Sequence, residues 1–383
     1  MRLAAACFGL VLVVGLTGVP GCGQAFYDLI AGQFHVDFPE YALIGEDDAG
    51  RALLAVRQEP FSLEGDDPVY DIFALDLATL TAEKLTGDIQ TAASLLRATG
   101  ASVVWADWSD GTVTLRDLQA GADRVVLPGV EGAGGQVAPV ALDDARLVAH
   151  RPVDLTGAAS PATYELVVID LATDAQTVLP DSWLYATVAV SGDYLALMND
   201  ADGNARLLGL ELGADLEIVN LTTGAREKIA SNIRVSGDGG ELFAGAGRFV
   251  WQQFKSGGFD TVLRSYDPLT QELRTLADPL NDATGVAWVV DVRGDQMLIE
   301  RVYGSLLSTE TTAYELRAFD GRSAAVVQFS RGLFQQQAYQ PSPRFAAGYV
   351  IWTDPDDGRL TIFEPATRTT RHFDPRTLSD ADN

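Results

Sequence analysis

The sequence is poor in the residues from which proteins build disulfides, metal centres and basic surfaces. Its 383 residues include 2 cysteines and 3 histidines. Both cysteines, Cys7 and Cys22, lie near the N-terminus, so no disulfide framework can hold the remainder of the chain together. The histidines stand far apart with no HExxH or HxH spacing, which argues against a catalytic zinc site.

Positive charge is also scarce. The chain has 27 Lys and Arg against 53 Asp and Glu, a formal net charge of -26 and a pI near 4.3. No cluster of Lys or Arg offers the basic footprint that a phosphate backbone needs, so we exclude nucleic acid as a partner. The acidity favours a soluble exported or surface protein, and it also suits a face that attracts cations or a basic partner.

Long apolar runs are absent except at the N-terminus. Arg2 is followed by an apolar stretch over residues 3–14, a glycine-rich segment and then Cys22. This order is typical of a short secretory signal peptide. No other segment approaches the roughly 18 apolar residues of a transmembrane helix. We therefore predict a cleaved signal peptide over residues 1–21.

The four residues VPGC, which end at Cys22, resemble the lipobox of bacterial lipoproteins. The resemblance implies that Cys22 becomes the lipidated N-terminus of an exported protein, tethered to the membranes of the cell envelope. The next residue is Gly23 rather than aspartate, which by resemblance to enterobacterial sorting favours the outer membrane. Residues 22–40 would form the lipidated tether and entry segment. The alternatives are a plain secreted protein cut near Gly23 and an uncleaved N-terminal anchor.

A repeated unit dominates the sequence after the tether. Seven times, a strand-like segment ends in an acid or an amide, turns, and restarts as another strand. These anchor residues are Asp76, Asp117, Asp170, Asn220, Asp267, Asp320 and Glu364. Subtracting their positions gives spacings of 41 to 53 residues, a range typical of propeller blades.

Each anchor is followed by two further regularities. Three positions on, six of the seven units carry Ser or Thr, whose hydroxyl can bond the backbone of a tight turn. Nine positions on, every unit carries a large apolar residue: Leu85, Val126, Leu179, Ile229, Leu276, Phe329 and Phe373. A second apolar segment precedes each anchor, at residues 53–56, 103–105, 146–149, 194–197, 249–251, 297–299 and 349–352.

Two units align without a gap at an offset of 247 residues, which places Asp110-Gly111 on Asp357-Gly358. Asp-Gly between alternating segments predicts a hairpin, because glycine readily adopts the positive φ that the turn requires.

Four short strands per unit, with no crossover helices, predict an all-β chain. We expect a single β-propeller of about seven four-stranded blades over residues 41–375, followed by a polar tail at residues 376–383. Paired sandwiches would not explain one period of about 50 residues, and β-helix coils are much shorter.

Three segments of the fourth unit carry a family likeness: VSGDYLAL from Val190, NDADGN from Asn199 and LEIVNL from Leu216. Together they resemble the WD40-like repeat of TolB-type propellers, which implies the propeller fold. The DLAT turns are also similar to the repeats of quinoprotein-like propellers, so that class stays open.

Candidate chemistry is sparse. Residues 200–204 place oxygen ligands at the first, third and fifth positions of a calcium loop, with Glu211 at the twelfth. Ala205 stands where that loop needs its glycine, so we predict an ordinary hairpin and no metal there. The chain has no GxSxG elbow, and the glycine-rich residues 130–135 lack the lysine of a phosphate loop. We therefore assign no catalytic, cofactor or metal residue.

One patterned feature suggests an interaction surface. Acidic residues recur in the hairpins that join second to third strands, which lie on one face of a propeller. Besides Glu64, the predicted acidic face comprises Asp66, Asp67, Asp107, Asp110, Asp200, Asp202, Asp354, Asp356 and Asp357. Their charges would add to a common field. The alternative is that aspartate simply forms good turns.

These observations predict a non-catalytic scaffold in the cell envelope that binds a protein or a small ligand. The alternative is a propeller enzyme, or a quinoprotein-like protein, that acts on glycans or small molecules, since fold does not dictate function. We interpret Trp105, Trp251 and Trp352, which recur at one position of the repeat, as core residues.

Overall fold

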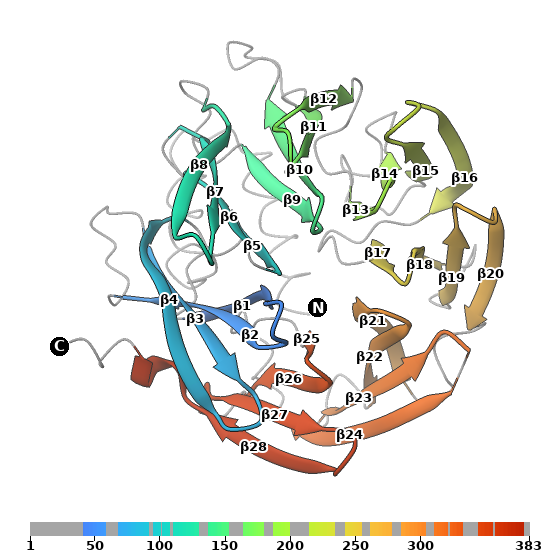
Figure 1. The fold of residues 1–383 in the computed structure, drawn as a ribbon. Helices are drawn as coiled ribbons and strands as arrows, with labels where there is room; N and C mark the ends of the chain where they lie inside the picture. The colour runs from blue at the N-terminus through green and yellow to red at the C-terminus, as the bar shows by residue number, and fades with distance from the viewer. Residues whose placement is uncertain are drawn as a thin grey trace, which may run out of the picture.

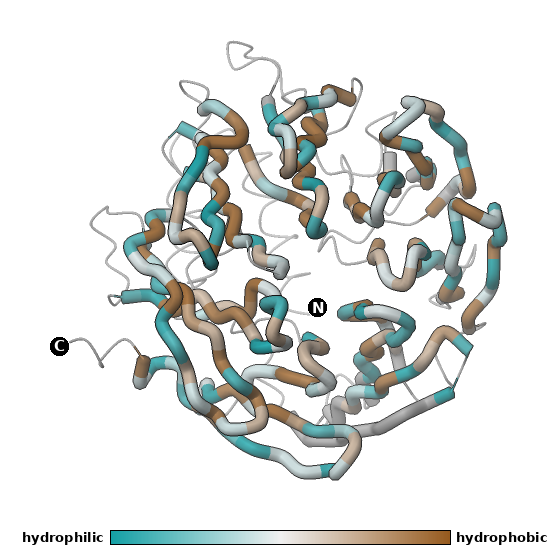
Figure 2. The backbone as a smooth tube through the Cα atoms, viewed as in Figure 1, coloured by the Kyte–Doolittle hydropathy of each residue, from teal (hydrophilic) through white to brown (hydrophobic). Residues whose placement is uncertain are grey.

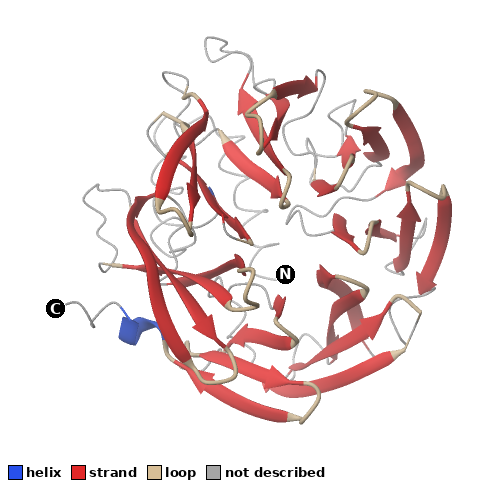
Figure 3. Cartoon of the chain, viewed as in Figure 1, coloured by secondary structure: helices blue, strands red, loops and turns tan. Residues whose placement is uncertain are grey.

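The computed structural model describes residues 41–58, 68–91, 95–100, 102–107, 110–129, 137–152, 164–179, 187–199, 214–233, 242–254, 261–277, 285–303, 310–320, 322–331, 344–354 and 357–378. The predicted signal peptide, Cys22 and the tether lie outside these residues. Strands make up most of what is described, and the short 3-10 helix η3, Pro375–Leu378, lies near the C-terminus (Figure 3). No helix in these ranges is long and apolar enough to span a bilayer.

Seven four-stranded antiparallel sheets form the described chain, and each sheet uses four consecutive strands. Blade 1 contains β1 Tyr41–Glu46, β2 Ala52–Arg57, β3 Val69–Asp76 and β4 Thr81–Gln90, and blade 2 contains β5 Leu96–Thr99, β6 Ser102–Ala106, β7 Val113–Asp117 and β8 Ala122–Leu127. Blade 3 contains β9 Ala138–Leu142, β10 Arg146–Pro152, β11 Tyr164–Asp170 and β12 Gln176–Leu179, and blade 4 contains β13 Val188–Ser191, β14 Tyr194–Asn199, β15 Ala214–Asn220 and β16 Arg226–Ile233. Blade 5 contains β17 Leu242–Gly245, β18 Arg248–Phe254, β19 Thr261–Asp267 and β20 Glu272–Ala277. Blade 6 contains β21 Gly285–Arg293, β22 Gln296–Tyr303, β23 Glu310–Ala318 and β24 Ser323–Arg331, and blade 7 contains β25 Arg344–Ala346, β26 Tyr349–Thr353, β27 Leu360–Glu364 and β28 Thr369–Phe373.

The blades stand radially around one axis, with the first strand of each blade innermost (Figure 1). Each innermost strand contacts the innermost strands of its two neighbours, so the ring runs β1, β5, β9, β13, β17, β21, β25 and back to β1. The predicted all-β propeller of seven four-stranded blades is therefore confirmed. The apolar segment predicted before each anchor lies in the second strand of its blade.

The core lies between the blades. Seven clusters of buried apolar residues are present among the described residues, one at each interface between neighbouring blades. Alternation along each strand produces this arrangement, because successive side chains point to opposite faces of a sheet. In β10, Leu147 packs toward blade 2 and Val148 packs toward blade 4. Figure 2 shows that hydrophobic residues recur along the strands of the blades.

The anchors form the turns between third and fourth strands as predicted. In five turns the anchor side chain accepts backbone N–H bonds of 2.8 to 3.2 Å from the residues two and three positions on: Asp76, Asp117, Asp170, Asn220 and Asp267. These donors stabilise the charged form, and the backbone of Thr79 is the largest cause of the lowered pKa of Asp76.

A positive φ follows in six of these turns, four positions after the anchor. The residues are Leu80, Gly121, Asp174, Gly224, Gln271 and Arg368, with φ from 56 to 72°. Only two of the six are glycine, so four side chains sit in the left-handed region that L-residues disfavour.

The ring closes between blades 7 and 1, and neither of these blades combines strands from both ends of the described chain. The strands of blade 1, β1 to β4, are the first four of the described chain, and the strands of blade 7, β25 to β28, are the last four. Side chains make the seam: the Tyr41 hydroxyl donates to the Gly358 carbonyl at 2.7 Å, and the Ala347 N–H donates to the Glu46 carboxylate at 2.9 Å. A buried cluster that includes Leu54 and Ile362 fills the space between the two blades.

Candidate functional site

Four members of the predicted acidic face lie in the described chain: Asp107, Asp110, Asp354 and Asp357. They occupy the hairpins between second and third strands of blades 2 and 7, at the same face of the ring, which we call the loop face. The other five lie outside the described residues: Asp66, Asp67, Asp200, Asp202 and Asp356. Glu64 and the calcium-loop pattern of residues 200–204 lie outside them as well.

The described carboxylates of the loop face bond within their own hairpins. The Thr112 N–H donates to Asp110 at 2.7 Å, and the backbone of Thr112 is the main cause of the lowered pKa of Asp110. Asp357 accepts both the backbone N–H of Arg359 at 3.0 Å and its guanidinium Nε–H at 2.6 Å, which lowers the pKa of Asp357. Turn formation thus accounts for these two acids, and the acidic interaction face stays a prediction.

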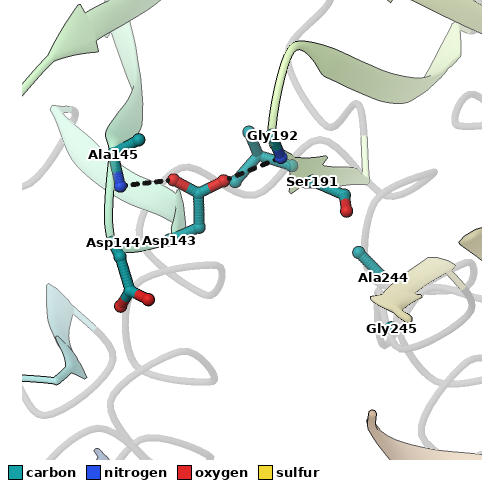
Figure 4. A pocket seen from close by; sticks show the side chains of 8 residues that line it. Asp143, Asp144, Ala145, Ser191, Gly192, Ala244 and Gly245 are labelled. Carbon is teal, nitrogen blue, oxygen red and sulfur yellow. Dashed lines mark hydrogen bonds between the residues drawn. The ribbon is translucent and has the colours of Figure 1, made fainter. Parts of the chain in front are cut away.

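The opposite face, which we call the turn face, carries the short turns between first and second strands, including residues 47–51, 143–145, 192–193, 246–247, 294–295 and 347–348. A hollow of about 340 Å³ opens there, at the ends of the innermost strands β9, β13 and β17. Its lining residues are small or acidic: Asp143, Asp144, Ala145, Val190, Ser191, Gly192, Ala244 and Gly245 (Figure 4).

Asp143 holds two walls of this hollow together. Its Oδ1 accepts N–H bonds from Ala145 at 2.9 Å and Arg146 at 2.7 Å, and its Oδ2 accepts the Gly192 N–H of blade 4 at 3.2 Å (Figure 4). Asp144 accepts the Thr99 hydroxyl of blade 2 at 3.0 Å. These acids therefore connect three consecutive blades, and their first role is to fix the rim of the channel.

Two arginines lie deeper in the ring, each on an innermost strand. Arg97 is the second residue of β5, and Arg344 is the first residue of β25. Blade 1 stands between their two blades, and the two guanidinium groups are still close enough to interact electrostatically. Both are half-buried. Burial first, and the positive charge of Arg344 second, lower the pKa of Arg97 to about 10.

Arg344 has no ion pair in the described part of the chain, although the protein carries a net charge of -26. By contrast, 14 other arginines of the described ranges form salt bridges with carboxylates. Arg97 and Arg344 thus place two positive charges on innermost strands of a strongly acidic protein.

No sequence pattern predicts this pair of arginines. Each stands alone in a short apolar strand, LRAT or RFA, with no repeated spacing around it. Only the ring closure brings blades 2 and 7 to opposite sides of blade 1.

Histidines do not form a metal centre in the described chain. His150 lies half-buried in β10, and His372 lies exposed in β28, 3.2 Å from the Thr361 hydroxyl. Within the ranges that the structure describes, no group of three or more His, Cys, Asp or Glu residues lies close enough together to hold a metal ion.

No protein-family model matches the sequence, and no curated protein matches it. By fold, the chain is similar to a prolyl endopeptidase, with a TM-score of 0.59 and 14% identity over 94% of this chain and 52% of that one. It is similar to an oligogalacturonate lyase in complex with manganese, with a TM-score of 0.52 and 14% identity over 88% and 91%. It is also similar to the β-propeller domain of the trilobed protease from Pyrococcus furiosus, described as having an open velcro topology, with a TM-score of 0.55 and 10% identity over 88% and 97%.

These likenesses agree with the seven-bladed fold, and this chain spans about half the length of the prolyl endopeptidase. TolB from Acinetobacter baumannii is similar at a TM-score of 0.40 and 12% identity over 81% of this chain and 77% of that one. The propeller fold that the resemblance of the fourth unit implied is confirmed by the seven four-stranded blades and agrees with the Pyrococcus furiosus propeller domain.

The prediction that the protein is non-catalytic is wrong, because enzymes share this architecture. The similar structures include a lyase and peptidases, which are enzymes. At 10 to 14% identity they share the fold alone. The propeller therefore does not separate a binding scaffold from an enzyme.

Proposed function

We propose that this chain is an exported, lipid-anchored propeller of the bacterial cell envelope that binds a small anionic ligand in its central channel. The signal-peptide pattern and the lipobox-like residues that end at Cys22 support export and lipid anchoring, with the outer membrane as the favoured membrane. The pair Arg97 and Arg344 carries the proposal of the ligand.

Electrostatics favours an anion between these two side chains. Two positive charges that share a partly desolvated channel repel one another, and the repulsion grows as the local dielectric constant falls. A carboxylate placed between them replaces repulsion with two attractions. The planar guanidinium fork also matches the geometry of a carboxylate, which makes arginine a better receptor for it than lysine.

Citrate, a small polycarboxylate, tests the channel site by isothermal titration calorimetry on the intact chain in detergent. We expect saturable binding that Arg344→Gln weakens at least about tenfold, since a hydrogen bond to a charged group is worth roughly 1.5 to 3 kcal/mol. Arg322→Gln is the matched control, because Arg322 is exposed and pairs with Asp320 in its own turn. Citrate binding that survives Arg344→Gln would contradict the channel site.

The proposed lipidation and membrane attachment are tested separately by labelling with a radioactive fatty acid and by membrane fractionation. The wild-type chain should incorporate label and sediment with membranes, whereas Cys22→Ser should do neither. A labelled or membrane-bound Cys22→Ser variant would contradict lipidation at this cysteine and would leave the channel site untouched.

A further inference from the structure

Blade 5 carries a second polar feature, away from the channel. Trp251 and Gln253 of β18 are two residues apart, so both point to the same face of the blade. Arg264 of β19 lies directly opposite Trp251 in the antiparallel register. Cross-strand partners on one face have Cβ atoms about 5 Å apart, and diagonal neighbours lie about 7 Å apart. We call these three side chains the polar cluster of blade 5.

Each member of the cluster has a buried polar atom with no hydrogen-bond partner: the Trp251 Nε1, the Gln253 Oε1 and the Arg264 Nε. The Trp251 side chain is 0% exposed, so its indole N–H has no access to bulk solvent. Buried polar groups are nearly always paired, and three unpaired ones on a single face are rare. Arg264 also forms no ion pair with any residue of the described ranges.

The neighbouring blade presents mainly apolar side chains to this interface, and the Glu227 carboxylate of that blade accepts the Tyr266 hydroxyl at 3.2 Å. Trp251 belongs to the buried cluster between blades 4 and 5, which includes Met198, Leu216 and Ile233 of blade 4. None of these side chains can accept a hydrogen bond from an N–H donor or donate one to an amide oxygen. Gln253 and Arg264 are only half-buried, so part of each side chain is exposed at the edge of this interface.

Blade 2 has a tryptophan at the corresponding position, Trp105, and an arginine with a partner on the neighbouring strand, although Arg116 pairs with Val103 and lies diagonally from Trp105 rather than directly opposite it. There Arg116 stacks over Trp105 at 5.5 Å and forms an ion pair with Asp123. Blade 5 lacks a carboxylate in that role among the described residues. Trp251, interpreted from the sequence as a core residue, is buried in the core, and its indole N–H has no hydrogen-bond acceptor.

We propose that the polar cluster of blade 5 binds a small carboxylic acid that carries a hydrogen-bond donor on the carbon next to its carboxylate. The two N–H donors of Trp251 and Arg264 suit the carboxylate oxygens. The Gln253 Oε1 suits the adjacent hydroxyl or amide N–H. The apolar wall of blade 4 then accommodates a short aliphatic group.

Three acids of similar size separate the contributions. Lactate supplies a hydroxyl donor, N-acetylalanine supplies an amide N–H, and propionate supplies neither. Calorimetric titration of the intact chain should show binding of at least one of the first two, and propionate should bind at least about tenfold more weakly because the Gln253 contact is lost.

Two variants test the donors. Trp251→Phe keeps a large apolar ring and removes only the N–H, and Arg264→Gln removes the charge; each should weaken binding at least about tenfold. Arg116→Gln in blade 2 is the matched control and should leave the affinity unchanged. Arg344→Gln should also leave it unchanged, which keeps this site distinct from the channel proposal.

Circular dichroism establishes whether each variant folds, and Arg264→Gln decides the matter alone if Trp251→Phe does not. Absence of binding by all three acids would overturn the proposal and leave an internal water as the partner of these atoms. Equal affinity for lactate, N-acetylalanine and propionate, or wild-type affinity in Arg264→Gln, would overturn it as well.

Discussion

Acid should destabilise this propeller through His150 before it titrates the carboxylates. His150 lies in β10, on the face of blade 3 that packs against blade 4 beside Val148 and opposite Leu166. Burial lowers the pKa of His150 to about 4. In the unfolded chain the pKa is about 6.5, so between these values the unfolded state binds more protons than the folded state. Folding stability therefore falls as the pH drops from about 6.5 toward 4.

The size of the effect follows from the two pKa values. Between pH 7 and pH 5 the loss is at most about 2 kcal/mol, because His150 is only half-buried and solvent screens part of the shift. Urea unfolding followed by tryptophan fluorescence at both pH values measures it. His150→Gln should abolish most of this pH dependence, whereas His372→Gln, on an exposed surface, should keep it. Equal losses in the wild type and in His150→Gln would refute the reasoning.

Three further substitutions test the backbone and the seam, each by urea unfolding. Gln271→Gly should raise the free energy of unfolding by up to about 1 kcal/mol, because the residue has a φ of 56°; a loss of stability would contradict strain there. Gly245→Ala should lower it by about 1 to 3 kcal/mol, because the new Cβ would lie 2.6 Å from the Gly294 carbonyl oxygen; a neutral result would mean that β17 and β21 can separate. Tyr41→Phe should lower it by about 1 to 2 kcal/mol through loss of the 2.7 Å bond to Gly358; no change would show that this hydroxyl does not stabilise the seam.

The fold was readable in the sequence because its information is local and repeated. Each anchor, such as Asp170, forms its turn with residues two and three positions away, so one short pattern marks a blade wherever it occurs. The matched hairpins of blades 2 and 7 also repeat the same bonds: Gly111 donates to the Asp107 carbonyl and Gly358 donates to the Asp354 carbonyl, both at 2.9 Å.

The candidate sites were not readable for the opposite reason. Arg97 and Arg344 approach each other across more than half of the chain, and no periodicity links them. Trp251 looked identical to Trp105 and Trp352, since what differs is the partner that each side chain meets across a blade interface. A repeat predicts where a side chain lies in its blade, and it carries no information about which positions lack a partner.

The seam between blades 7 and 1 has a consequence for how the molecule acquires its shape. Every blade is one continuous stretch of chain, so blades 1 to 6 can assemble in order from the N-terminal end during synthesis. Blade 1 is different, because the partners of Tyr41 and Glu46 across the seam lie 301 to 317 residues further along. Its flank, with Leu54, Phe73 and Leu75, stays uncovered until the last blade arrives. The first part of the propeller to form is thus the last to be protected, and that flank is where a chaperone would be needed most during folding.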